Sequence, residues 1–242
     1  MEIILAVPGD TILTLQNPNA PFAPWEGDSK PGPRSSTTPS PAPPPVLSSV
    51  LPPTPSPTLS PAPPPVLSPV VSPTPPPITF RLSSRHLIQA SAVFKAALTG
   101  GWKEGSTAAG GCYEINAEDW DAEAMRVVLS LVHSRTKAIP RSVTLEMLSK
   151  IAVLVDYYEL HEAVHFYASL WIDTLRNSLP RAYGRDLILW ICVSWIFKDA
   201  SIFQAVTKLV IEHSPGKVPT IQLPIPEKVI GKLSFSGALL RN

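Results

Sequence analysis

The sequence predicts an α+β protein, with strands near its beginning and helices through most of the rest. The stretches Thr11 to Leu15 and Ile78 to Leu82 have the composition, or the alternation of apolar and polar residues, of half-buried strands. From residue 119 onward, apolar residues instead recur every three or four positions, as they do on one face of a helix. Strands followed by a run of helices are typical of the α+β class.

The chain begins with a short apolar run, Ile3 to Val7, that follows Glu2. This run is too short for the core of a signal peptide and has no basic flank, and it is suited instead to an edge strand. The strand Thr11 to Leu15 comes next, and turn and loop residues take over after it.

Residues 16–77 are predicted to form a long disordered insertion rich in proline, serine and threonine. The part from Pro31 to Pro77 holds 20 of the 30 prolines and no aromatic residue. The sequence SPAPPPVLS occurs in it twice, at Ser40 to Ser48 and at Ser60 to Ser68, with a period of 20 residues. Without aromatic side chains and with many backbone donors missing, this part cannot build a packed core. We expect an extended segment with a bias toward polyproline II.

Two short helices are predicted after the strand Ile78 to Leu82. Ser83 or Ser84 is suited to cap the first helix, and Ser91 is suited to cap the second. The sequence Thr99-Gly-Gly then ends the second helix.

Further along, Cys112 to Ile115 is a short strand candidate, and the remaining elements are helical. The stretch 145–158 has two apolar stripes, which predicts a helix buried at the centre of the protein. The other helices are predicted from Met125, Val128, Leu129 and Val132, and over Val164 to Leu175, Leu187 to Phe197 and Ile202 to Ile211.

Composition and charge exclude several classes of partner. The formal net charge is +1, so no long-range attraction to nucleic acid or to an acidic membrane is expected. The most apolar run, Leu187 to Phe197, is short and lies between Asp186 and Lys198, which favours a buried helix over a membrane span. Cys112 and Cys192 form either two buried free thiols or one disulfide. We expect an intracellular protein, cytoplasmic or nuclear.

Several stretches of the sequence resemble the BTB/POZ domain, most closely its fungal members. The pattern F-x-V-H-K-x-x-L-x-x-x-S-x-x-F of that family is similar to the stretch from Phe80 to Phe94, with Leu87 and Ser91 on marked positions. "VPGDTILTL" resembles the opening strand, and "WICVSWIF" resembles the helical extension of the fungal group. The resemblance implies a BTB/POZ fold over residues 1–15 and 78–175, a helical C-terminal extension over 176–235 and a tail over 236–242.

The resemblance also implies a function as a non-enzymatic protein–protein interaction module without a cofactor. Members of this family associate with themselves or with another BTB domain, and some act as adaptors for a cullin-type ubiquitin ligase scaffold or for a nuclear complex. The interface candidates are Asp10, Arg85, Leu87 and Ile88. Where the family has a His and a basic residue that pairs with the opening Asp, this chain has Ser83 and Ser84. Asp10 is therefore expected to lack its usual partner unless Arg85 replaces it, which predicts either a dimer weaker than usual or a monomer that pairs with a different BTB domain.

The sequence His161-Glu-Ala-Val-His165 matches the H-E-x-x-H pattern of zinc proteases. In that pattern the two imidazoles face one way on a helix and bind zinc, and the glutamate acts as general base. Asp173 or Asp186 is the available third ligand, although neither lies in a known motif. A zinc-dependent hydrolase is therefore the alternative function, whereas a solvent-facing flank of an ordinary helix explains the same residues without metal.

The insertion also carries candidate regulatory sites. It offers P-x-x-P at Pro41/Pro44 and Pro61/Pro64 for a partner with an SH3- or WW-type groove. An inert spacer is the other interpretation. The candidate sites for proline-directed phosphorylation, each a Ser or Thr before Pro, are Thr38, Ser40, Thr54, Ser56, Ser60, Ser68, Ser72 and Thr74.

Overall fold

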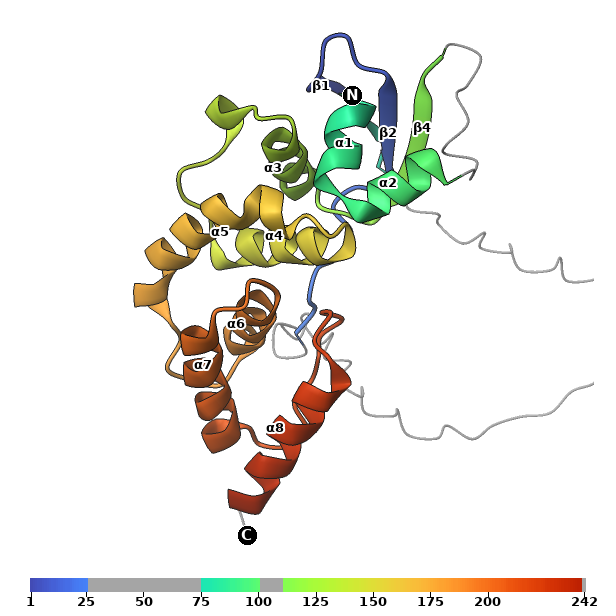
Figure 1. The fold of residues 1–242 in the computed structure, drawn as a ribbon. Helices are drawn as coiled ribbons and strands as arrows, with labels where there is room; N and C mark the ends of the chain where they lie inside the picture. The colour runs from blue at the N-terminus through green and yellow to red at the C-terminus, as the bar shows by residue number, and fades with distance from the viewer. Residues whose placement is uncertain (26–74, 101–110, 241–242) are drawn as a thin grey trace, which may run out of the picture. The chain divides into compact units, whose positions relative to one another are not determined.

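The computed structural model describes residues 1–25, 75–100 and 111–240. Over these residues the chain has one four-stranded sheet and eight α-helices (Figure 1). The α+β class is therefore confirmed. No helix in the described ranges is both long enough and apolar enough to cross a membrane.

The sheet is built on two antiparallel strands that the proline-rich insertion separates in the sequence. β2 (Thr11–Gln16) and β3 (Ile78–Leu82) confirm the two predicted strands, and they pair with each other. β1 (Glu2–Ile4) runs parallel to β3, and β4 (Tyr113–Glu118) runs parallel to β2. The strand order is β1-β3-β2-β4. The fully buried apolar side chains of β2 and β3 are Leu13, Leu15, Phe80 and Leu82.

Two short helices follow β3 directly. α1 (Ser84–Ala90) begins after Ser83, but neither predicted serine caps it through its side chain, because Ser83 makes no such bond and the Ser84 hydroxyl is used elsewhere. α2 (Ala92–Thr99) is capped as predicted, with the Ser91 Oγ accepting a hydrogen bond from the Phe94 amide at 3.0 Å. The helix ends at Gly100.

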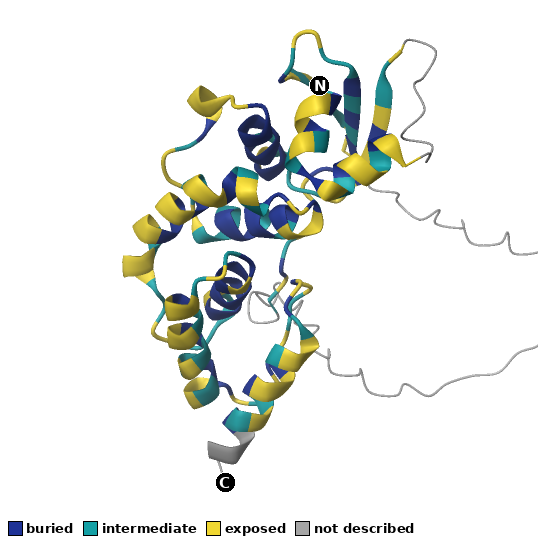
Figure 2. Cartoon of the chain, in the orientation of Figure 1, coloured by how far each residue is buried: buried dark blue, intermediate teal, exposed yellow. Residues whose placement is uncertain are grey.

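The predicted central helix is confirmed as α4 (Leu145–Tyr157), which contacts α3, α5 and α6. Its buried residues occupy both predicted stripes, and Figure 2 shows them, like most of α3, in dark blue. α3 (Ala122–Val132) begins at Asp121, whose carboxylate accepts from two backbone amides of the first turn. A short 3-10 helix, η3 (Thr136–Ala138), lies in the loop between α3 and α4.

In the described residues of the C-terminal part, helices are the only regular elements, and irregular stretches connect them. Most of α6 is buried, including Trp190 and Cys192, so the predicted apolar core helix is confirmed. Each large apolar side chain buried there contributes roughly 1.5–3 kcal/mol to folding. α8 continues to Leu240, so the boundary predicted at residue 235 divides a helix and is corrected. The elements are α5 (His161–Leu175), η4 (Arg176–Ser178), α6 (Arg185–Ile196), α7 (Ala200–His213) and α8 (Glu227–Leu240).

The start of the predicted disordered insertion is also corrected. β2 includes Gln16, and the following residues are packed rather than disordered. The Arg185 guanidinium donates to the backbone oxygens of Phe22 and Ala23, and the Trp25 ring lies 6.0 Å from the Tyr183 ring between centroids. This segment therefore joins the sheet to α6. The remaining insertion, residues 26–74, lies outside the described residues.

Candidate protein interaction surface at the edge of the sheet

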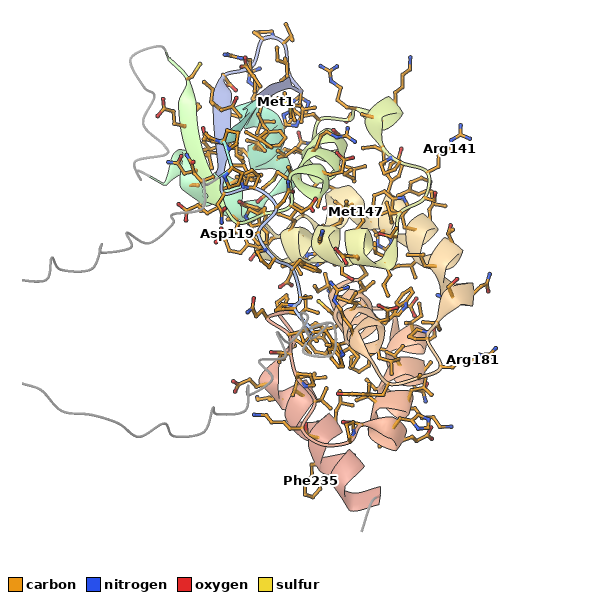
Figure 3. The ribbon with its side chains drawn as sticks, turned by 180° about the vertical axis from the view of Figure 1, so that it is seen from behind. Met1, Asp119, Arg141, Met147, Arg181 and Phe235 are labelled. Atoms are coloured by element: carbon orange, nitrogen blue, oxygen red, sulfur yellow. The ribbon has the colours of Figure 1, made fainter. Side chains whose placement is uncertain are left out.

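The first seven residues, Met1 to Val7, form an exposed apolar margin of the sheet, which we call the N-terminal edge. β1 pairs with β3 on one side, and within the described residues no strand pairs with its other side. Met1 is 75% exposed, Ile4 is 52% exposed and Val7 is 81% exposed. Figure 3 labels Met1 at this end of the molecule. An unpaired strand edge flanked by exposed apolar side chains is a template for association with another chain.

The backbone of the N-terminal edge is held firmly, while the side chains of Met1, Ile4 and Val7 are exposed and Leu5 is buried in the core. The Leu5 amide donates to the Arg81 carbonyl oxygen at 2.9 Å, and the Thr79 amide donates to the Met1 carbonyl oxygen at 2.9 Å. The Arg135 Nε donates to the Leu5 carbonyl oxygen at 3.0 Å. Since the backbone of the edge is already ordered, it loses little conformational entropy when a partner binds.

Gly9 lets the chain pass close to β3 after this edge. A Cβ atom at Gly9 would lie 2.5 Å from the Arg81 Cγ and 3.0 Å from the Leu82 carbonyl oxygen. The second of these atoms belongs to the backbone of a central strand, which cannot move aside easily. The glycine is therefore required for the approach that places Asp10 next to the start of α1.

The Asp10 carboxylate is not unpaired, which corrects the prediction from the sequence. The Ser84 amide donates to Oδ1 at 2.7 Å, and the Ser84 hydroxyl donates to Oδ2 at 2.6 Å. Burial raises the pKa of Asp10, but the hydrogen bonds from the Ser84 side chain and backbone outweigh it and hold the pKa below its usual value. Ser84, which replaces the basic residue of the family pattern, is thus the partner within the same chain, and Arg85 is exposed and makes no bond to this carboxylate.

The other two interface candidates have different positions. Leu87 is fully buried inside the protein, so its side chain is not available to a partner and the prediction for it is wrong. Ile88 is half-buried and packs in part against the core. The sequence pattern marks Leu87 strongly because a leucine there is required for the core.

A buried histidine that the sequence did not single out connects α3 to the start of α1. The His133 Nε2 accepts a hydrogen bond from the Ser83 amide at 3.0 Å, and its Nδ1 lies 2.8 Å from the Leu129 carbonyl oxygen. These two contacts fit the neutral ring with its proton on Nδ1. The His86 ring stacks on it with centroids 5.1 Å apart. Burial lowers the pKa of His133, with smaller contributions in the same direction from His86 and Arg135, while the Leu129 carbonyl opposes them.

We predict a loss of stability on acidification that depends on His133. Because its pKa is lower in the folded state than the unfolded value of about 6.5, stability is complete above that pH and falls as the pH drops toward the folded pKa. The His133→Gln variant should therefore show a smaller decrease in the free energy of unfolding between about pH 7 and pH 5. Urea denaturation at several pH values tests this, with the exposed His165→Gln as control. The prediction would be contradicted if the unfolding free energy fell equally with pH in the unmodified chain, His133→Gln and His165→Gln.

The H-E-x-x-H sequence lies at the beginning of α5. Val164 and Ala168 are buried, whereas Glu162 and His165 are exposed. His161 is half-buried and lines a shallow cavity of about 470 Å³ beside Trp195. Among the residues that the structure describes, no three His, Cys, Asp or Glu side chains come together as a metal site. Asp173, one proposed third ligand, lies instead 3.7 Å from the Arg176 guanidinium.

The remaining sequence candidates are resolved as follows. Cys112 and Cys192 are both free, and the expected burial holds for Cys192 but only in part for Cys112. Burial raises the pKa of Cys192 to about 12. The P-x-x-P sequences and all eight phosphorylation candidates lie outside the described residues.

In comparisons with known proteins, no family model matches the chain, and no curated protein matches it.

Proposed function

We propose that this chain is a non-enzymatic protein–protein interaction module that associates with itself through the N-terminal edge. The observation that carries the proposal is that no described strand pairs with the outer side of β1, while the side chains of Met1, Ile4 and Val7 are exposed. Two copies related by a two-fold axis would bring the same strand edges together, so that each contact occurs twice. A three-residue strand supplies few backbone hydrogen bonds, so the apolar side chains provide most of the affinity.

A BTB/POZ-like architecture is part of the proposal. It is supported by the arrangement of β3, α1 and α2, in which Phe80, Leu87 and Phe94 are buried and Ser91 caps a helix at the marked positions of the pattern. A second BTB domain, a cullin-type scaffold or a nuclear complex is the class of partner that such an architecture implies.

The zinc-dependent hydrolase is the less favoured proposal. The two imidazoles of the H-E-x-x-H sequence differ in burial, and in the described ranges no third ligand stands beside them. A catalytic zinc site normally has three protein ligands and an open fourth position. The N-terminal edge, by contrast, needs no further residue to serve as a binding surface.

Sedimentation of the full-length chain over a range of concentrations tests self-association. We expect reversible dimer formation that the double variant Ile4→Asp/Val7→Asp weakens by at least about tenfold, since two carboxylates would have to be buried in each half of the interface. Phe235→Asp is the matched control, because Phe235 is 70% exposed on α8 (Figure 3) and should leave dimer formation unchanged. A chain that stays monomeric, or a dimer that tolerates both carboxylates, would contradict the proposal.

A further inference from the structure

A groove lies between the loop that follows α3 and the outer face of α5. Its volume is about 610 Å³, and its lining includes Lys137, Ile139 and Arg141 from the loop, together with Tyr167 and Leu170 from α5. None of these residues belongs to the N-terminal edge. We call this feature the α5 groove.

The loop side of the α5 groove is fixed in place by the core. The Trp171 indole Nε1 donates to the Pro140 carbonyl oxygen at 3.0 Å, and Ile139 is only 8% exposed. The Trp171 ring itself is almost completely buried. The backbone on both sides of Ile139 is therefore anchored, and the positions from which Lys137 and Arg141 project are defined before any partner binds.

The α5 groove combines exposed cations with exposed apolar surface. Lys137 and Arg141 are exposed, and Figure 3 shows Arg141 pointing away from the ribbon. On the opposite wall Leu170 is 45% exposed, and Phe166, which lies one helical turn before it, is 66% exposed. A leucine and a phenylalanine left in water on one helix face indicate a surface that a partner covers.

None of the described residues that line the α5 groove carries a carboxylate. The acidic residues of α5 are Glu162 and Asp173, and Asp173 lies close to the Arg176 guanidinium instead. Within the described residues, neither Lys137 nor Arg141 forms an ion pair, in contrast to Lys150, which is bound by two carboxylates. The charge of the groove is therefore positive and uncompensated.

We propose that the α5 groove binds an acidic amphipathic segment of a partner protein, with apolar side chains against Leu170 and Tyr167 and carboxylates against Lys137 and Arg141. Charge complementarity selects the acidic side of that segment, and the apolar wall requires side chains that a nucleic acid backbone does not have. Carboxylates at the rim accelerate encounter and reject basic segments, while the buried leucine or aromatic contacts provide the affinity. The residues that line this groove are distinct from those of the N-terminal edge.

Selection from a library of random short peptides displayed against the full-length chain tests the proposal. The enriched peptides should carry acidic residues interspersed with leucine or aromatic residues at helical spacing. A synthetic peptide with the enriched sequence should bind the full-length chain in fluorescence anisotropy, and the double variant Lys137→Glu/Arg141→Glu should bind it at least about tenfold more weakly. Leu170→Ser should weaken it as well, which separates the apolar contribution from the charge.

The controls distinguish this groove from non-specific attraction. Arg181→Glu makes the same charge reversal as each change in the double variant, but at an exposed position outside the groove (Figure 3). This variant should leave the peptide affinity unchanged. A single-stranded oligonucleotide with the same charge as the peptide should bind much more weakly. The proposal would be overturned if the enriched peptides lacked acidic residues, or if the oligonucleotide bound as tightly as the peptide. It would also be overturned if the peptide affinity survived both the charge reversal and Leu170→Ser.

Discussion

Replacing Leu87 with alanine is expected to lower the free energy of unfolding by about 3 kcal/mol without a specific effect on association. The side chain is fully buried in the hydrophobic core, so its removal leaves a cavity that the surrounding residues fill only in part. Urea denaturation measures the loss of unfolding free energy. If the slope of that free energy against urea concentration is unchanged, the folded state keeps its compactness.

Ile4→Ala is the matched control for Leu87→Ala. Ile4, the last residue of β1, is also a branched aliphatic residue, but half of its surface is already in water. We expect this change to cost less than about 1 kcal/mol of stability while weakening dimer formation. The reverse result, in which Leu87→Ala dissociates a dimer at constant stability, would return Leu87 to the interface.

The elements that depend on local pattern were predictable. Alternation identified β3, and helical spacing identified α3 and α4. The helix α6 was identified instead by an apolar run that lies between Asp186 and Lys198. The short helix α2 was also predictable from Ser91, since a side-chain cap acts over three residues. Whether Leu87 packs inside the chain or against a second copy was not, because both environments select the same apolar residue.

The features that the sequence did not reveal arise from contacts between distant segments. Phe22 and Trp25 precede a proline-rich stretch and follow several turn residues, so nothing local indicates that they pack near Arg185 and Tyr183. The cations of the α5 groove face Leu170 only because the loop folds back onto α5. Ser84 likewise becomes a partner for Asp10 only once β2 and β3 are paired, which places residues far apart in the sequence within hydrogen-bonding distance.

The contact between Asp10 and Ser84 is expected to stabilise the protomer rather than a dimer. Asp10→Ala should lower the free energy of unfolding by about 2–3 kcal/mol, because it removes a charged acceptor and leaves the Ser84 amide and hydroxyl without it. Ser84→Ala keeps the amide donor and should cost about 1 kcal/mol. In a double-mutant cycle, Asp10→Ala should cost less when Ser84 is already alanine, and the difference measures the hydroxyl–carboxylate bond alone.

The dependence on pH provides an independent test of the same contact. The pKa of Asp10 is lower in the folded protein than its usual value of 3.8, so the carboxylate contributes stability that is complete above that pH and disappears as the pH falls through the folded pKa. The difference in unfolding free energy between the unmodified chain and Asp10→Asn should therefore shrink between about pH 6 and pH 3. Sedimentation of Asp10→Asn should give the same dimer affinity as the unmodified chain at neutral pH. If the variant instead dissociates while its unfolding free energy stays the same, the carboxylate acts between subunits, because a bond confined to one chain cannot change association without changing the stability of that chain.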